Sequence, residues 1–318
     1  MEVFSLGVVK LSNEKKLRFN PFGDDRPIDD AVLVRKLIID DLVEDVSTSK
    51  KDVERVAALL KRSLDNQILT KLDLSDLKDE AYPHLNMLLD AVQTTSGYLD
   101  SLKISLDKWD PWMDRIASTK WWSRVEHIQL VFRDHQKLEP ALKKISKHLK
   151  SVRSLSLSAV AWDFGESPSI FQSLLIDIPL VHLFIRAKKI CSNVIVTCSR
   201  ALVMPEANLI RLNLHNICNQ SSLDLICLGV AGARQLTYLD LKIQIADSQH
   251  VLRTLNKSLH LNNTLHELRL GFESCDEKMP FEDDLFDEFC AVAFHHPKLI
   301  ALVKKNNASF FFKRFMYR

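Results

Sequence analysis

Glycine is scarce in this chain, which has 7 glycines among 318 residues. Phosphate-binding loops need glycine where the backbone approaches a ligand, and neither GxGxxG nor GxxxxGK[ST] occurs in the sequence. We also find no GxSxG, HExxH or comparable pairing of a nucleophile with a base. We therefore predict that the chain is not an enzyme and needs no cofactor.

Net charge and long apolar runs are also limited. The chain has 43 basic and 41 acidic residues, a formal net charge of +2, which gives no large basic field to attract nucleic acid. No window approaches the roughly 20 apolar residues that span a bilayer, and the first residues lack the basic start of a secretory signal. We predict an intracellular protein, cytoplasmic or nuclear, that binds neither membrane nor nucleic acid.

Disulfide and metal motifs are missing as well. The six cysteines all lie in the second half of the chain and form no CxxC, and we expect free, buried thiols. These residues are Cys191, Cys198, Cys218, Cys227, Cys275 and Cys290.

A repeated hexapeptide is what the sequence does contain. Apolar residues recur at positions i, i+3 and i+5, with mostly polar residues between them, as in LTYLDL and LHELRL. The copies begin at Val34, Leu69, Leu99, Val125, Val152, Leu180, Leu209, Leu236, Leu265 and Leu299. Nine are good copies and the tenth is weaker, because Lys304 takes its last apolar position. Their spacing averages about 29 residues, which lies in the range of leucine-rich repeats.

Each hexapeptide predicts a short strand, because the alternation at i+3 and i+5 places one face inward. Segments with helical spacing follow, for example Val53 to Leu64 after the first copy, Leu138 to Leu149 after the fourth and Val251 to Leu259 after the eighth. A single strand with a single helix cannot bury its own apolar face. The units must therefore stack into a parallel sheet covered by helices.

The chain resembles the ribonuclease-inhibitor-like class of leucine-rich-repeat proteins over about residues 30 to 305. The best local match is LRTLNKSLHLNNTLHELRLG (252–271), where a helix ends in NNTL and runs directly into the next strand. The resemblance implies an α/β horseshoe of about ten repeats, with the parallel sheet on its concave side and helices on its convex side. The usual Asn or Cys at i+8 is missing from all copies except the last, which has Asn307; Ile217 is one replacement.

Both ends of a repeat array need caps. We predict an N-terminal cap over residues 1–30, repeats over 31–305, and a C-terminal cap or tail over 306–318. The final segment FFFKRFMYR combines aromatic and basic residues, so it either folds over the last repeat or serves as an exposed docking peptide.

Positions i+2, i+4 and i+6 project from the concave face, and there we predict a protein-binding site. Aromatic and Arg side chains supply most interface hot spots, and they gather in the columns from Leu180 to Leu270. The candidate residues are His182, Phe184, Arg186, Arg211, Asn213, His215, Tyr238, Asp240, Glu267 and Arg269. The alternative is a solvated face on which such residues pair internally, for example Asp240 with Arg269 on neighbouring strands.

Two histidines on this face do not form a metal site. His182 and His215 belong to rows i+2 and i+6, so about 13 Å of strand separates them, too far for a shared ion. We predict no metal and a noncatalytic scaffold or adaptor that binds another protein, whose identity the sequence does not give.

One segment suggests a different partner. SLDLICLGVA (222–231) resembles the elongin-binding box of cullin ubiquitin-ligase adaptors, S/T-L-x3-C-x3-A. This resemblance implies a substrate-recognition subunit that binds elongin and cullin. The segment also lies where a repeat helix is expected, in which case Leu223, Ile226 and Cys227 belong to the core.

Overall fold

The structure is a computed structural model that describes part of the chain. The described residues are 2–5, 9–10, 16–17, 34–38, 50–66, 71–74, 87, 90–91, 99–105, 125–132, 143, 146, 149, 151–159, 174–175, 178–188, 190, 192–206, 208–245, 247–272, 283–305 and 311–313. The helix predicted over Leu138 to Leu149 lies mostly outside these residues. The chain divides into two compact units, Met1–Phe132 with Pro140–Val152, and Arg133–Glu139 with Arg153–Arg318.

The first unit contains a parallel run of strands. Its order is β1 (Glu2–Ser5), β4 (Val34–Ile38), β5 (Lys71–Leu74), β6 (Leu99–Ser105) and β7 (Val125–Phe132). Helix α1 (Lys50–Asp65) follows β4 and buries Leu60 and Leu64, as its helical spacing predicts. Strands β2 (Val9–Lys10) and β3 (Lys16–Leu17) form a separate antiparallel pair.

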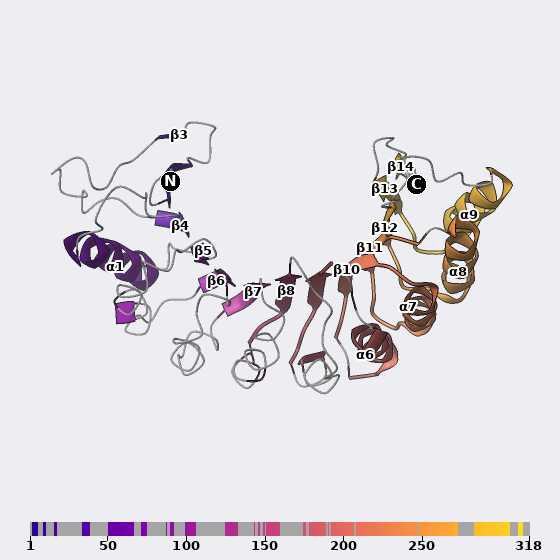
Figure 1. Cartoon of the computed structure of the whole chain (residues 1–318), viewed down its shortest axis with the longest axis horizontal. Coiled ribbons are helices and arrows are strands. Elements are labelled where there is room, and N and C mark those ends of the chain that lie inside the picture. Colours follow the sequence, from indigo (N-terminus) through magenta and orange to yellow (C-terminus); the bar gives the residue numbers. More distant parts are fainter. Residues whose placement is uncertain are drawn as a thin grey trace. The chain divides into compact units, whose positions relative to one another are not determined.

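The second unit alternates strands and helices. Its parallel strands are β8 (Ser154–Ala159), β9 (His182–Arg186), β10 (Arg211–Ile217), β11 (Tyr238–Ile243), β12 (Glu267–Phe272) and β13 (Ala301–Lys305), and β14 (Phe311–Lys313) runs antiparallel to β13. Between them lie α6 (Ser192–Val203), α7 (Gln220–Gly232), α8 (Ser248–Leu261) and α9 (Asp283–His295). These four helices lie side by side along one face of the strands (Figure 1).

The repeat determines the strand register. Within the second unit, Leu155, Leu183, Leu212, Leu239, Leu268 and Leu302 are successive partners across the strands, and each of them is position i+3 of its hexapeptide. The i+3 leucines through Leu268 are buried, as are Leu72, Leu102 and Ile128 in the first unit. The predicted α/β fold with a parallel sheet is therefore confirmed, and every predicted hexapeptide overlaps a strand.

A bulge in β10 explains part of the missing i+8 pattern. Asn216 adopts a φ of 76°, in the left-handed region, and the pairing of β10 with β11 shifts register between His215 and Ile217. The Asn216 Nδ2 atom donates to the carbonyl oxygen of Ala187, in the loop of the preceding repeat. An asparagine at position i+7 therefore joins the end of β10 to the loop after β9, and Ile217 at position i+8 is buried.

In two repeats, the same kind of hydrogen bonding stabilises the connection from the helix to the next strand. The Asn262 Oδ1 atom accepts from the N–H groups of Thr264 and Leu265 at 2.9 and 2.8 Å, and its Nδ2 donates to Val230 O at 2.7 Å. One repeat later, the Nδ1 atom of His296 accepts from the N–H groups of Lys298 and Leu299 at 3.3 and 3.0 Å. Both side chains are buried, so a histidine ring replaces an asparagine amide in the same role.

This role makes stability depend on the neutral form of His296. Burial lowers the pKa of His296 below its usual value, whereas the unfolded chain takes up the proton near pH 6.5. The free energy of unfolding should therefore be insensitive to this group above about pH 6.5 and fall as the pH is lowered further, by at most about 1.4 kcal/mol per pH unit.

We expect His296→Asn, which supplies an untitratable oxygen as Asn262 does, to reduce this decline. Urea unfolding at about pH 7.5 and about pH 5.5, compared with wild type, measures the change. His295→Asn, which removes the exposed neighbouring imidazole, is the control. An equal decline in wild type and His296→Asn would contradict the prediction.

Candidate functional site

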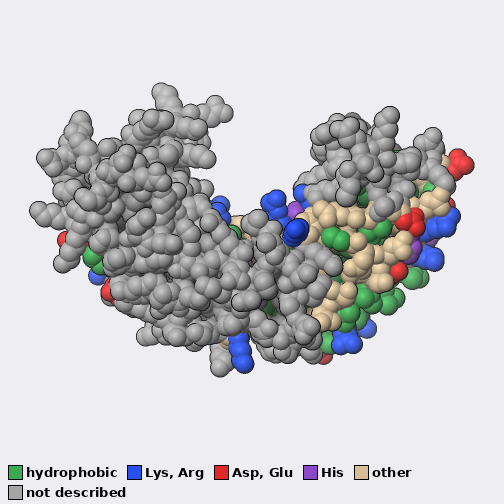
Figure 2. Space-filling model, viewed as in Figure 1, with side chains coloured by type: hydrophobic (Ala, Val, Ile, Leu, Met, Phe, Trp, Pro, Cys, Tyr) green, Lys and Arg blue, Asp and Glu red, His purple; other side chains and the backbone are tan. Residues whose placement is uncertain are grey.

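The ten predicted site residues lie on neighbouring strands of the second unit. We call them the open-face patch, because along β9–β12 they alternate with the buried leucines and isoleucines and so lie on the opposite side of the strands from these. The helices α6–α9 lie along one face of the strands (Figure 1). The members of the patch are His182, Phe184, Arg186, Arg211, Asn213, His215, Tyr238, Asp240, Glu267 and Arg269. Figure 2 shows Lys, Arg and His side chains gathered on this side of the strands.

The strand register arranges the patch in rows. His182, Arg211, Tyr238 and Glu267 are successive partners in one row, and Phe184, Asn213, Asp240 and Arg269 are successive partners in the next. Arg186 and His215 begin a third row, which Lys242 continues. The strand pattern also places Lys242 on this face, at position i+6, but the predicted set omits it.

Tyr238 is the centre of the first row. The guanidinium carbon of Arg211, from β10, lies 5.3 Å from the centroid of the Tyr238 ring, and that of Arg269, from β12, lies 5.2 Å from it. Both distances are within the range of cation–π attraction. Burial and the nearby Asp240 carboxylate raise the pKa of Tyr238, so its phenol is neutral at physiological pH. The ring thus holds two cations in place on a solvent-facing surface.

The middle of the patch is less accessible than the alternation predicts. Asp240 is only 2% exposed and His215 only 7% exposed. The His215 ring packs edge-on against Phe184 with centroids 4.8 Å apart, and its Nε2 atom lies 3.9 Å from Oδ1 of Asp240. Asn213 donates to the other oxygen of Asp240 at 3.4 Å. Asp240 and His215 therefore form a floor beneath the longer side chains.

The carboxylate partner of Arg269 also differs from the expected one. Arg269 Nε lies 2.6 Å from Glu267 Oε1, two residues earlier on the same strand, whereas the sequence suggested Asp240 on the neighbouring strand. The hydrogen bond with Glu267 raises the pKa of Arg269. Residues two apart on a strand share a face, so the observed pair keeps Glu267 and Arg269 together in the patch.

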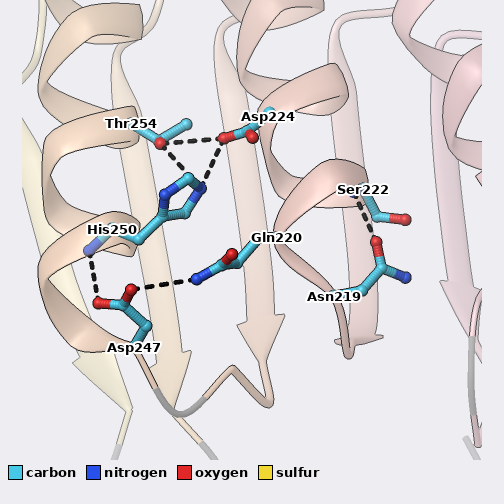
Figure 3. A network of polar contacts seen from close by, with 7 residues as sticks. All are labelled: Asn219, Gln220, Ser222, Asp224, Asp247, His250 and Thr254. Atoms are coloured by element: carbon cyan, nitrogen blue, oxygen red, sulfur yellow. Dashed lines mark hydrogen bonds and ion pairs between the residues drawn. The ribbon is translucent and has the colours of Figure 1, made fainter.

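A second polar cluster lies on the helices (Figure 3). His250 Nε2 and Thr254 Oγ1 both contact Asp224 Oδ1, at 2.8 and 3.0 Å. In a catalytic triad the histidine lies between nucleophile and carboxylate and uses both of its nitrogens. Here the Asp224 carboxylate lies between His250 and Thr254, and the same histidine nitrogen, Nε2, faces both the carboxylate and the Thr254 hydroxyl. The cluster joins α7 to α8 and has no catalytic geometry.

Hydrogen bonds at the helix starts extend this junction. Asn219 accepts from the Ser222 N–H at 2.7 Å, and Asp247 accepts from the His250 N–H at 2.9 Å, so each caps its helix. Gln220 donates to Asp247 at 3.1 Å and links the two helix starts. These polar groups therefore fix neighbouring helices to one another.

Two of the thiols and the elongin-like segment belong to the core, whereas Cys218 and Cys290 are free but only partly buried, contrary to the prediction. Cys198 and Cys227 are buried free thiols, and burial raises the pKa of each to about 12. Leu223 and Ile226 are also fully buried in α7, as the helical alternative for residues 222–231 predicts. Cys191 and Cys275 lie outside the described residues.

In the described part of the chain, no three His, Cys, Asp or Glu side chains come together as metal ligands. None of the helices described is long and apolar enough to cross a bilayer.

The register and the helix that follows each of β9–β12 define a leucine-rich-repeat-like α/β fold. No protein-family model matches the chain, and no curated protein matches it. Among solved structures, it is similar to a chain of the "Crystal structure of Rad7 and Elc1 complex in yeast", with 13% sequence identity and a TM-score of 0.43. The match covers 79% of this chain and 66% of that chain, slightly less than two thirds of its length. Similarity at this level assigns no family.

Proposed function

We propose that this chain is a noncatalytic protein-binding scaffold or adaptor whose open-face patch contacts its partner. The observation that carries the proposal is the placement of the half-buried Tyr238 between the guanidinium groups of Arg211 and Arg269. Tyr and Arg dominate interface hot spots. Side chains already held by neighbours lose less conformational freedom on binding, so this arrangement favours recognition.

We place the patch within a horseshoe of about ten repeats over residues 31–305, with caps over 1–30 and 306–318. The antiparallel pairing of β14 with β13 supports the capping role of the C-terminal segment over a free docking peptide. The free thiols Cys198 and Cys227 support a reducing, intracellular location.

Combined replacement of Phe184, Arg211 and Tyr238 by alanine tests the patch. We expect the variant to lose its main partner, with affinity at least about a hundredfold lower, because each replaced side chain is a hot-spot type. The measurement is affinity purification with mass spectrometry, followed by titration of the partner that wild type recovers. Circular dichroism and urea unfolding establish that the variant remains folded.

A variant altered on the helices is the matched control. Arg200→Ala with Arg253→Ala removes two exposed cations from α6 and α8 and leaves the open-face patch intact. It should recover the same partner as wild type. Retained binding by the folded triple variant would refute the patch as the binding surface.

The second candidate function is a substrate-recognition subunit of a cullin-type ubiquitin ligase. It rests on the Ser222–Ala231 segment, in which Leu228 is 69% exposed on α7. Leu223 and Cys227 are buried, so contact with elongin through them requires α7 to leave its repeat. Gel filtration with purified elongin separates the two candidate functions. Comigration of the chain with elongin that Leu228→Ala abolishes supports the adaptor function, and independent elution opposes it.

A further inference from the structure

The charges of the open face are unequal in number. Arg186, Arg211, Lys242 and Arg269 face Asp240 and Glu267 across β9–β12, which leaves a formal excess of two positive charges with histidine neutral. The whole chain, by comparison, is nearly neutral at +2. Positive charge is therefore concentrated on this face, where it raises the local concentration of acidic groups.

Burial removes one carboxylate from the accessible charges. The Asp240 side chain is buried, and the Glu267 carboxylate is engaged by Arg269 at 2.6 Å. Arg186 and Arg211 are exposed, and among the described residues neither forms an ion pair with a carboxylate. The charge that an approaching molecule meets is thus mainly guanidinium, with its N–H donors still available.

The cations form two pairs. Arg211 and Arg269 lie on either side of Tyr238, and Arg186 and Lys242 are the strand partners on either side of His215. Arg211 and His215 are four residues apart on β10, so the pairs are separated by about 13 Å along the strands. An extended peptide that follows the strands spans this distance in about four residues.

We propose that the open-face patch recognises an acidic segment of its protein partner, with Asp or Glu side chains about four residues apart that reach the two cation pairs. The proposal rests on the proposed function and specifies the chemistry of the partner. Guanidinium groups bind carboxylates through paired hydrogen bonds. Phe184, between the two pairs, offers an aromatic surface to an apolar residue of the same segment.

Selection from a random dodecapeptide display library tests this chemistry without a known partner. The full chain is the target, and the folded Phe184→Ala, Arg211→Ala, Tyr238→Ala variant is used for counter-selection. We expect the enriched peptides to contain more Asp and Glu than the input library. Fluorescence anisotropy of the best peptide should show about tenfold weaker binding to Arg186→Gln and to Arg211→Gln. Binding should also weaken as salt is raised.

Matched variants and a nucleic-acid probe serve as controls for the acidic-segment proposal. Arg200→Gln and Arg253→Gln remove the same charge from the helices and should bind the peptide as wild type does. Enrichment of neutral or basic peptides, or of none, would overturn the acidic-segment proposal. The proposal would also be overturned if a single-stranded oligonucleotide bound more tightly than the best peptide and its binding depended on Arg211. The proposed function fails separately, if the triple alanine variant still captures the natural partner.

Discussion

Replacing Asn262 with alanine is expected to lower the free energy of unfolding by about 2–4 kcal/mol, the largest effect of any single polar substitution we predict. The change leaves Val230 O without its side-chain donor and the N–H groups of Thr264 and Leu265 without their acceptor. Asn262 is buried, so water does not readily replace these bonds. Urea unfolding followed by circular dichroism measures the loss.

Asn263 provides the control for this substitution. It follows Asn262 directly in the same connection but is exposed. Asn263→Ala should change stability by less than about 0.5 kcal/mol. Equal losses in the two variants would show that the connection tolerates neither change, and the hydrogen bonds of Asn262 would then not be the cause.

The substitution Gly229→Ala should destabilise the protein by about 2 kcal/mol, because α6 and α7 meet closely at this residue. A Cβ atom at Gly229 would lie 2.7 Å from Cα and 2.8 Å from the carbonyl oxygen of Ser199. Both are backbone atoms, so α6 must move as a whole. That movement also strains the 2.6 Å hydrogen bond from Ser199 Oγ to Leu225 O. The clash outweighs the gain of about 1 kcal/mol that alanine brings to a helix interior.

Gly232, at the end of the same helix, supplies a matched comparison. A Cβ atom there would come within 3 Å of the Val203 side chain alone, and Val203 is 41% exposed at the end of α6, so it can shift toward solvent. Gly232→Ala should therefore be neutral or stabilising by up to about 1 kcal/mol. Thermal and urea unfolding of both variants test the contrast. Equal destabilisation at the two positions would contradict the close approach at Gly229.

The sequence predicts the strands well because their register and burial follow one rule. Positions i, i+3 and i+5 face the helices, and stacking places equivalent leucines, such as Leu212 and Leu239, opposite one another. The NNTL segment also indicates the connection after α8. No pattern indicates its repetition at His296, because a histidine and an asparagine share no sequence pattern even when each offers one acceptor in the same place.

The details of the patch were less predictable. Alternation tells which face a side chain occupies, but not whether longer neighbours cover it, so the short Asp240 side chain is buried in a row expected to be accessible. Whether Arg269 pairs with Glu267 or with Asp240 depends on side-chain rotamers, which the strand pattern does not determine. The repeat pattern does not indicate Asn216, because a bulge moves the loop-joining asparagine from i+8 to i+7.

The direction of β14 bears on how molecules of this protein meet in concentrated solution. Six strands of the second unit run the same way, from β8 to β13, and β14 then runs the opposite way along β13. A second molecule that added a repeat strand in the common direction would have to pair with β14 in antiparallel fashion. Head-to-tail growth of filaments through this edge would therefore break the parallel register that relates each repeat to the next.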